Sequence, residues 1–166
     1  MSRLSARYAQ LIRMCRRRGY SRDDAEDLVQ EAHLRFFDYQ RSRTVRDADS
    51  LLRRIVVNLS ITHFHREVST PFTFESARIL HRRGMLVDPA PGPERILAGE
   101  QRLDRVVRLL SALSPRMCQI FIAQRGGYSY EEIAAAFAVK PRTVDKHVSS
   151  AMQTLAEMMP EEFASS

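Results

Sequence analysis

The stretch that decides the fold is SYEEIAAAFAVKPRTVDKHVSSAMQTLAEM, residues 129–158. It opens with Ser129 and Glu132, the capping-box pattern of a helix start. Residues 138–140 then separate this short helix from Pro141, which suits the first turn of a second helix because its missing N–H is not needed there. The spacing therefore predicts a helix-turn-helix, whose second helix enters the major groove of DNA in many proteins.

The predicted second helix has one apolar and one polar face. The apolar residues recur at helical spacing and are expected to pack inward: Val144, Val148, Ala151, Met152, Leu155 and Met159. The outer residues are small and polar or charged, a chemistry suited to contacting base edges: Arg142, Thr143, Asp145, Lys146, Ser149 and Ser150. An ordinary solvated helix whose charges touch nothing is the alternative interpretation.

Two more helices and a linker precede this pair. One helix is predicted over residues 95–112, and another from Pro115 to the glycine pair that begins at Gly126. Residues 69–97 are rich in proline and predict a flexible linker with a short helical piece around Phe74–Leu80. We therefore expect an all-α protein of two small helical domains, residues 1–68 and 98–162, joined by this linker.

The N-terminal domain is expected to contain three helices. The first spans Leu4–Arg18 and ends at Gly19, the second spans residues 22–39 behind an N-cap at Ser21, and the third spans residues 49–66. The second helix carries acids in its first turns, where the helix dipole favours them. The third helix exposes a mixed basic and polar face: Arg53, Arg54, Asn58, Thr62, His65 and Arg66.

Charge alternates along the chain. Of the 26 basic residues only Lys140 and Lys146 are lysines, and the formal net charge is +6. Residues 1–20 carry six arginines and no acid, whereas residues 21–40 carry two arginines and six acids. This alternation favours more than one kind of partner, with a mosaic of solvated faces as the alternative.

Several classes of function are not supported by the sequence. Cys15 and Cys118 lie singly in apolar-periodic stretches, so we expect buried free thiols and a reducing, cytoplasmic compartment. No apolar run is long enough to span a membrane. No phosphate loop, nucleophile elbow or metal-ligand spacing accompanies the Ser, His and Asp residues. We therefore predict no enzyme, no cofactor, no metal site and no small-molecule substrate.

Three ordered stretches carry a resemblance to a known family. They are DAEDLVQEAHLRFF (24–37), SLLRRIVVNLSITHFHRE (50–67) and LSPRMCQIFIAQRGGYSYEEIAAAFAVKPRTVDKHVSSAMQTL (113–155). In this order and at this spacing they resemble the extracytoplasmic-function sigma factors of bacterial RNA polymerase, over nearly the whole chain. SPRMCQIF, SYEEIA and TVDKHV together with PGPERIL resemble the iron-starvation type, typified by the ferric-citrate sigma factor.

The resemblance implies a dissociable subunit of RNA polymerase. It would bind core enzyme, direct promoter-specific initiation at minus-35 and minus-10 elements, and assist DNA melting. The resemblance assigns minus-10 contacts to the six outer residues of the third helix, and minus-35 contacts to the six outer residues of the last. It assigns core-polymerase binding to Asp24, Asp27, Gln30 and Glu31.

The same resemblance implies a regulator and a set of target genes. Iron-uptake or cell-envelope response genes are the expected targets. The expected regulator is an anti-sigma factor, a cytoplasmic segment of an inner-membrane protein linked to an outer-membrane receptor.

Three residues depart from the family pattern. This chain has Thr62 where members often have Asp, Ala138 where Gly is common, and Ser150 where Arg is frequent. If the turn needs a positive φ, Ala138 costs on the order of 1 kcal/mol.

Two other functions fit the residues. The first is a stand-alone helix-turn-helix regulator that binds duplex operator without polymerase. The second is a helical adaptor with no role on DNA.

Overall fold

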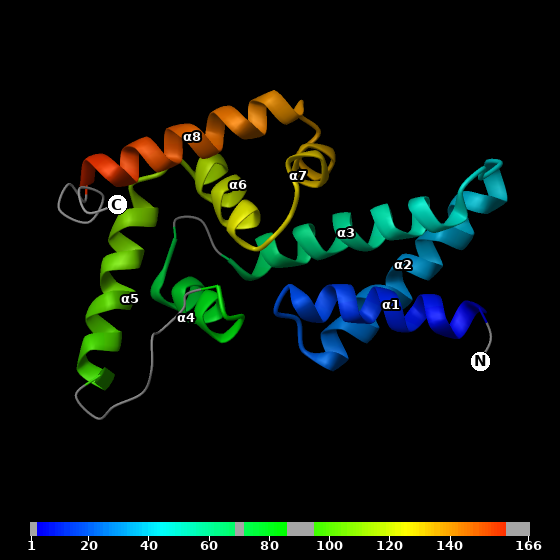
Figure 1. Cartoon of the computed structure of the whole chain (residues 1–166), viewed down its shortest axis with the longest axis horizontal. Helices are drawn as coiled ribbons and strands as arrows, with labels where there is room; N and C mark the ends of the chain where they lie inside the picture. The colour runs from blue at the N-terminus through cyan, green and yellow to red at the C-terminus, as the bar shows by residue number, and fades with distance from the viewer. Residues whose placement is uncertain (1–2, 69–71, 86–94, 159–166) are drawn as a thin grey trace. The chain divides into compact units, whose positions relative to one another are not determined.

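All the secondary structure that the structure describes is helical (Figure 1). The computed structural model describes residues 3–68, 72–85 and 95–158. They fold into two compact units, Met1–Phe64 and His65–Ser166, which confirms the expected all-α architecture with two helical bodies. The helices are α1 (Arg3–Arg17), α2 (Arg22–Ser42), α3 (Ala48–Glu67), α4 (Phe74–Arg82), α5 (Arg95–Ser111), α6 (Pro115–Arg125), α7 (Tyr130–Phe137) and α8 (Pro141–Met158).

The helix ends follow local signals in the sequence. Beyond α1, Gly19 takes a φ of 82°, a left-handed conformation that suits glycine. The Ser21 hydroxyl accepts a hydrogen bond from Asp24 N–H at 3.0 Å, and the short Asp24 carboxylate accepts from the Ser21 hydroxyl at 2.6 Å. At α7 the longer Glu132 side chain reaches back to the Ser129 N–H at 2.9 Å and completes a capping box.

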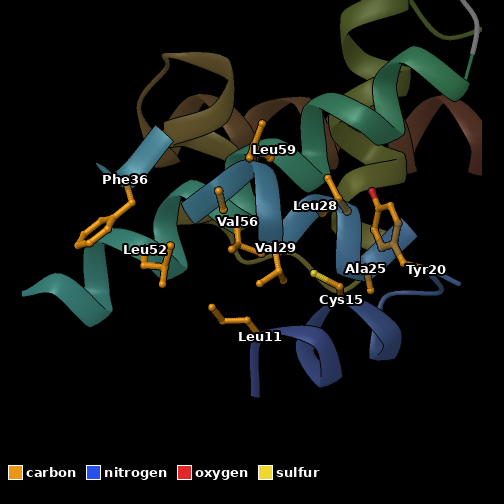
Figure 2. Close-up of a cluster of buried hydrophobic side chains, with 11 residues drawn as sticks. Leu11, Cys15, Tyr20, Ala25, Leu28, Val29, Phe36, Leu52, Val56 and Leu59 are labelled. Atoms are coloured by element: carbon orange, nitrogen blue, oxygen red, sulfur yellow. The ribbon is translucent and has the colours of Figure 1, made fainter. Parts of the chain in front are cut away.

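The core of the first unit lies between α1, α2 and α3 (Figure 2). After α1, the Tyr20 hydroxyl donates a hydrogen bond to the Ser60 carbonyl of α3 at 2.5 Å. Helix α2 buries its predicted stripe: Ala25, Leu28, Val29, Ala32 and Phe36. Helix α3 is buried on more than one side. Its buried residues are Leu52, Val56, Val57, Leu59, Ser60, Ile61 and Phe64.

The second unit contains α4, which lies inside the predicted linker. The helical piece expected there is confirmed as Phe74–Arg82, with Ala77 and Leu80 buried, and it packs against α5. The Ser111 hydroxyl of α5 also donates a hydrogen bond to the Phe72 carbonyl at 3.1 Å. Residues 72–85 of the predicted linker are therefore folded, because their apolar side chains pack against a partner helix. Its proline-rich part, residues 86–94, lies outside the described residues.

Both cysteines are free and buried, as predicted. Burial raises the pKa of Cys15 to about 11 and that of Cys118 to about 11. Neither thiol is therefore ionised near neutral pH. Among the helices that the structure describes, none is both long and apolar enough to cross a membrane.

Candidate nucleic-acid interface

The turn between α7 and α8 has a left-handed residue at its start. Ala138 takes φ 53° and ψ 45°, the conformation for which glycine is preferred. The N–H of Val139 donates to the Ala134 carbonyl at 2.9 Å, which closes the end of α7. The turn therefore has the geometry expected of a helix-turn-helix, with alanine in the strained position.

Helix α8 presents most of the predicted reading residues to solvent. Its predicted inner residues Val144, Val148, Ala151 and Leu155 are buried. Met152 was predicted to face inward but is 39% exposed, because it lies at the edge of that stripe. Met159 lies outside the described residues. Thr143 is half-buried, and the other outer residues are exposed: Arg142, Asp145, Lys146, Ser149 and Ser150.

An arginine of α6 contacts the end of α7. The Arg116 guanidinium donates a hydrogen bond to the Phe137 carbonyl at 3.1 Å, and its central carbon lies 5.8 Å from the centre of the Phe137 ring. This contact occupies one of the carbonyls that a helix end leaves without an intrahelical partner. Arg116 therefore helps to fix the turn that orients α8, a role that the sequence did not indicate.

The predicted outer residues of α3 do not all share one line. Arg54, Asn58, Thr62 and Arg66 follow one another at i+4 spacing and so lie along one line of the helix. Arg53, although exposed, is four residues before the buried Val57 and lies off this line. The structure therefore brings four of the six predicted minus-10 residues into one row.

Two residues of this row are linked by a hydrogen bond. The Thr62 hydroxyl donates to the Asn58 carbonyl at 2.8 Å. The Asn58 side-chain oxygen is buried and has no hydrogen-bond partner among the described residues. A buried acceptor without a donor costs roughly 1–3 kcal/mol.

His65 is half-buried, although the helical spacing placed it on the outer face. Its ring lies edge-on to the Phe137 ring, with 4.7 Å between the ring centres. Desolvation lowers the pKa of His65 to about 4. The imidazole is therefore neutral near pH 7 and adds no positive charge to the α3 row.

The predicted acidic face of α2 is exposed throughout: Asp24, Asp27, Gln30 and Glu31. Glu31 also pairs with Arg35 of the next turn at 2.6 Å. Leu34 and Phe37, 67% and 58% exposed, continue this face toward the C-terminal end of the helix. These two apolar residues were not predicted from the sequence, where their only signal is that they fall outside the buried stripe.

The start of α3 is fixed by Asp47, a role that was not predicted from the sequence. The Asp47 carboxylate accepts hydrogen bonds from the N–H groups of Asp49 and Ser50 at 3.1 and 3.0 Å, and from the Ser50 hydroxyl at 2.6 Å. The bond from the Ser50 hydroxyl is the main cause that lowers the pKa of Asp47. An Asp three residues before a Ser was the signal that could have identified it.

Comparisons with known proteins assign both units to one family. Residues 4–70 match Sigma-70 region 2, and residues 103–155 match Sigma-70, region 4. The chain is 27% identical over 131 residues to the ferric citrate uptake sigma factor FecI of Escherichia coli (strain K12), covering 78% of this chain and 73% of that protein. No solved structure matches.

Proposed function

This chain belongs to the sigma-70 family of transcription initiation factors, in its extracytoplasmic-function, FecI-like group, and we propose that it directs core RNA polymerase to a specific set of promoters. In this proposal α2 binds the polymerase, α3 captures the minus-10 element, and α8 reads the minus-35 duplex. The protein acts on DNA in the cytoplasm as part of the polymerase and supplies no active site.

The observation that carries this proposal is that the two candidate reading helices lie mainly in different compact units. Two weak contacts joined by a tether bind more strongly than either alone, because the second contact becomes effectively intramolecular. This arrangement suits a promoter with two separated elements better than a single operator site.

The acidic face of α2 supports the polymerase contact. Asp24, Asp27 and Glu31 are exposed carboxylates, and they would repel DNA phosphates. Their partner is therefore a protein surface of opposite charge. The exposed Leu34 and Phe37 also suit a protein partner, because covering an apolar patch removes it from water.

The row on α3 supports capture of a base from an opened duplex. Extruding a base costs a few kcal/mol, and a protein offsets this cost by holding the base in a pocket. Asn58 is half-buried in this row, and an amide can pair with a base edge through a donor and an acceptor. We therefore place the cradle at Asn58 and the neighbouring loop, residues 41–48.

Asn58→Ala tests this cradle in the polymerase holoenzyme. We expect open-complex formation, measured by permanganate reactivity of unpaired thymines, to fall far more than binding of the closed duplex. Gln119→Ala, which removes a half-buried amide from α6, serves as the matched control. Equal loss of closed and open complexes in Asn58→Ala would contradict the cradle.

Transcription in vitro tests the function itself. Purified protein mixed with core RNA polymerase is expected to form a holoenzyme and to start transcription from a subset of a promoter library. A gel shift without polymerase separates this function from a stand-alone regulator, which would bind duplex operator alone. Failure to assemble with core polymerase would overturn the proposal.

The proposed targets and regulator are inferred from the similarity to the ferric citrate uptake sigma factor. That protein is named for ferric citrate uptake, and we propose that the promoters read here serve iron uptake or the cell-envelope response. We further propose an anti-sigma segment of an inner-membrane protein as the regulator. Mapping the transcripts that start with this holoenzyme, with and without iron limitation, tests the proposed targets.

A further inference from the structure

Helix α1 carries charge that none of the functions above uses. Residues 1–20 contain six arginines and no acid, and the chain as a whole has a net charge of +6. The remaining residues, 21–166, are therefore neutral in sum. Residues 1–20 therefore carry as much net charge as the whole chain.

Three arginines of α1 form one exposed patch. Arg13, Arg16 and Arg17 are adjacent on the helix surface because they are spaced i, i+3 and i+4. They lie on the side of α1 away from Leu11 and Cys15, which point into the core of the first unit (Figure 2).

These three arginines have no carboxylate partner within the part of the chain that the structure describes. Some other exposed arginines of the first unit do have carboxylate partners. Arg7 pairs with Asp49 at 2.7 Å, and Arg22 pairs with Glu26 at 2.8 Å. The patch is therefore available to an external anion.

Two contacts fix the position of α1 along the candidate minus-10 helix. Arg7 of α1 meets Asp49 near the start of α3, and Tyr20 after α1 meets Ser60 later in α3. The two helices therefore run in the same direction, and both rise about 1.5 Å per residue. Residues 13–17 thus lie level with the stretch of α3 that contains Arg54 and Asn58.

We propose that Arg13, Arg16 and Arg17 bind the phosphate backbone of the promoter strand that leaves α3, independently of base sequence. This inference rests on the proposed function. Arginine suits the role because its guanidinium is always charged and binds phosphate in a bidentate manner. An acidic polymerase surface fits less well, because the polymerase surface that meets the neighbouring acidic α2 must itself be basic.

The test removes the patch from the full-length protein in holoenzyme. The variant Arg13→Gln/Arg16→Gln/Arg17→Gln is compared with wild type for promoter binding between 50 and 200 mM salt. Each lost phosphate contact lowers the slope of log K against log salt by about 0.9 for duplex and about 0.7 for a single strand. We expect the slope to fall by about 2 to 3, with core-polymerase affinity unchanged.

A matched variant separates local contact from total charge. Arg78→Gln/Arg82→Gln/Arg108→Gln removes three exposed arginines from α4 and α5 and is expected to leave the slope unchanged. An unchanged slope in the α1 variant, or an equal change in both variants, would overturn the inference. Loss of core-polymerase affinity in the α1 variant would also overturn it and assign the patch to the enzyme. If wild type itself fails to assemble with core polymerase, the proposed function fails instead, and this inference with it.

Discussion

The two helices proposed to read DNA, α3 and α8, differ in how much of their surface is buried. Helix α3 buries seven of its 20 residues, whereas α8 buries four of its 18. A helix that packs along one stripe leaves a broad outer face, which suits a major groove. A helix embedded on more than one side offers a narrow row, which suits holding a single extruded base. The difference in burial therefore parallels the difference in the DNA that each helix is proposed to meet.

The largest expected effect tests the burial of α3. Phe64 is 2% exposed, and Phe64→Ala should lower the free energy of unfolding by about 3–5 kcal/mol, because it removes a buried ring and leaves a cavity. Met152→Ala in α8, where the side chain is 39% exposed, is the comparison and should cost much less. Denaturant unfolding followed by circular dichroism measures both, and similar losses would break the contrast.

The next effect tests the open face of α8. Arg142→Ala and Lys146→Ala should each weaken binding of holoenzyme to the minus-35 element by about 1–3 kcal/mol if the side chain contacts a base edge. Gln153→Ala, an exposed residue further along the same helix, is the control and should have little effect. Competition binding with promoters altered only at minus-35 provides the measurement. Equal weakening on every sequence would indicate phosphate contacts.

The third effect depends on pH and tests the buried end of α3. The pKa of His65 is lowered to about 4, below the value of about 6.5 expected in the unfolded chain. The unfolded state therefore binds more protons in this window, and stability should fall as pH drops from about 6.5 to about 4. His65→Gln should flatten this part of the pH profile, measured by thermal unfolding. His81→Gln, at an exposed position of α4, should leave it unchanged.

The smallest effect tests the turn before α8. Ala138 has φ 53°, so Ala138→Gly should raise the free energy of unfolding by up to about 1 kcal/mol. Ala135→Gly, at an exposed position inside α7, should lower it by about 1 kcal/mol. Opposite signs from the same substitution three residues apart are the expected result. A loss of stability in both would show that the turn does not strain alanine.

Local signals made much of the fold predictable from the sequence. Ser129 with Glu132, and Gly19 after α1, act within a few residues, so a sequence pattern is enough to identify them. The helical piece in the linker was also predictable, because Phe74–Leu80 combines a polar start with apolar spacing. Asp47 was within reach for the same reason, although its bond to Ser50 was overlooked.

Features that depend on distant residues were not predictable in this way. Helical spacing placed His65 on an outer face, but the ring of Phe137 lies against it. The same spacing could not show that α3 buries both Val57 and Ile61. Leu34 and Phe37 were missed because their exposure depends on what the rest of the chain leaves uncovered. The assignment of the site residues to particular contacts remains a prediction that the variants above test.

The hydrogen bond from Thr62 to the Asn58 carbonyl limits what this side chain can offer to a nucleotide. The hydroxyl of Thr62 has one proton, and it is donated to the Asn58 carbonyl. Toward a nucleotide, Thr62 can therefore act only as a hydrogen-bond acceptor. A base that meets this hydroxyl must bring an N–H donor, such as an exocyclic amino group or a ring N–H. Aspartate, which the family resemblance leads us to expect here, is likewise an acceptor when ionised. Compared with aspartate, threonine in this conformation is still a hydrogen-bond acceptor, but it places no negative charge near the DNA strand.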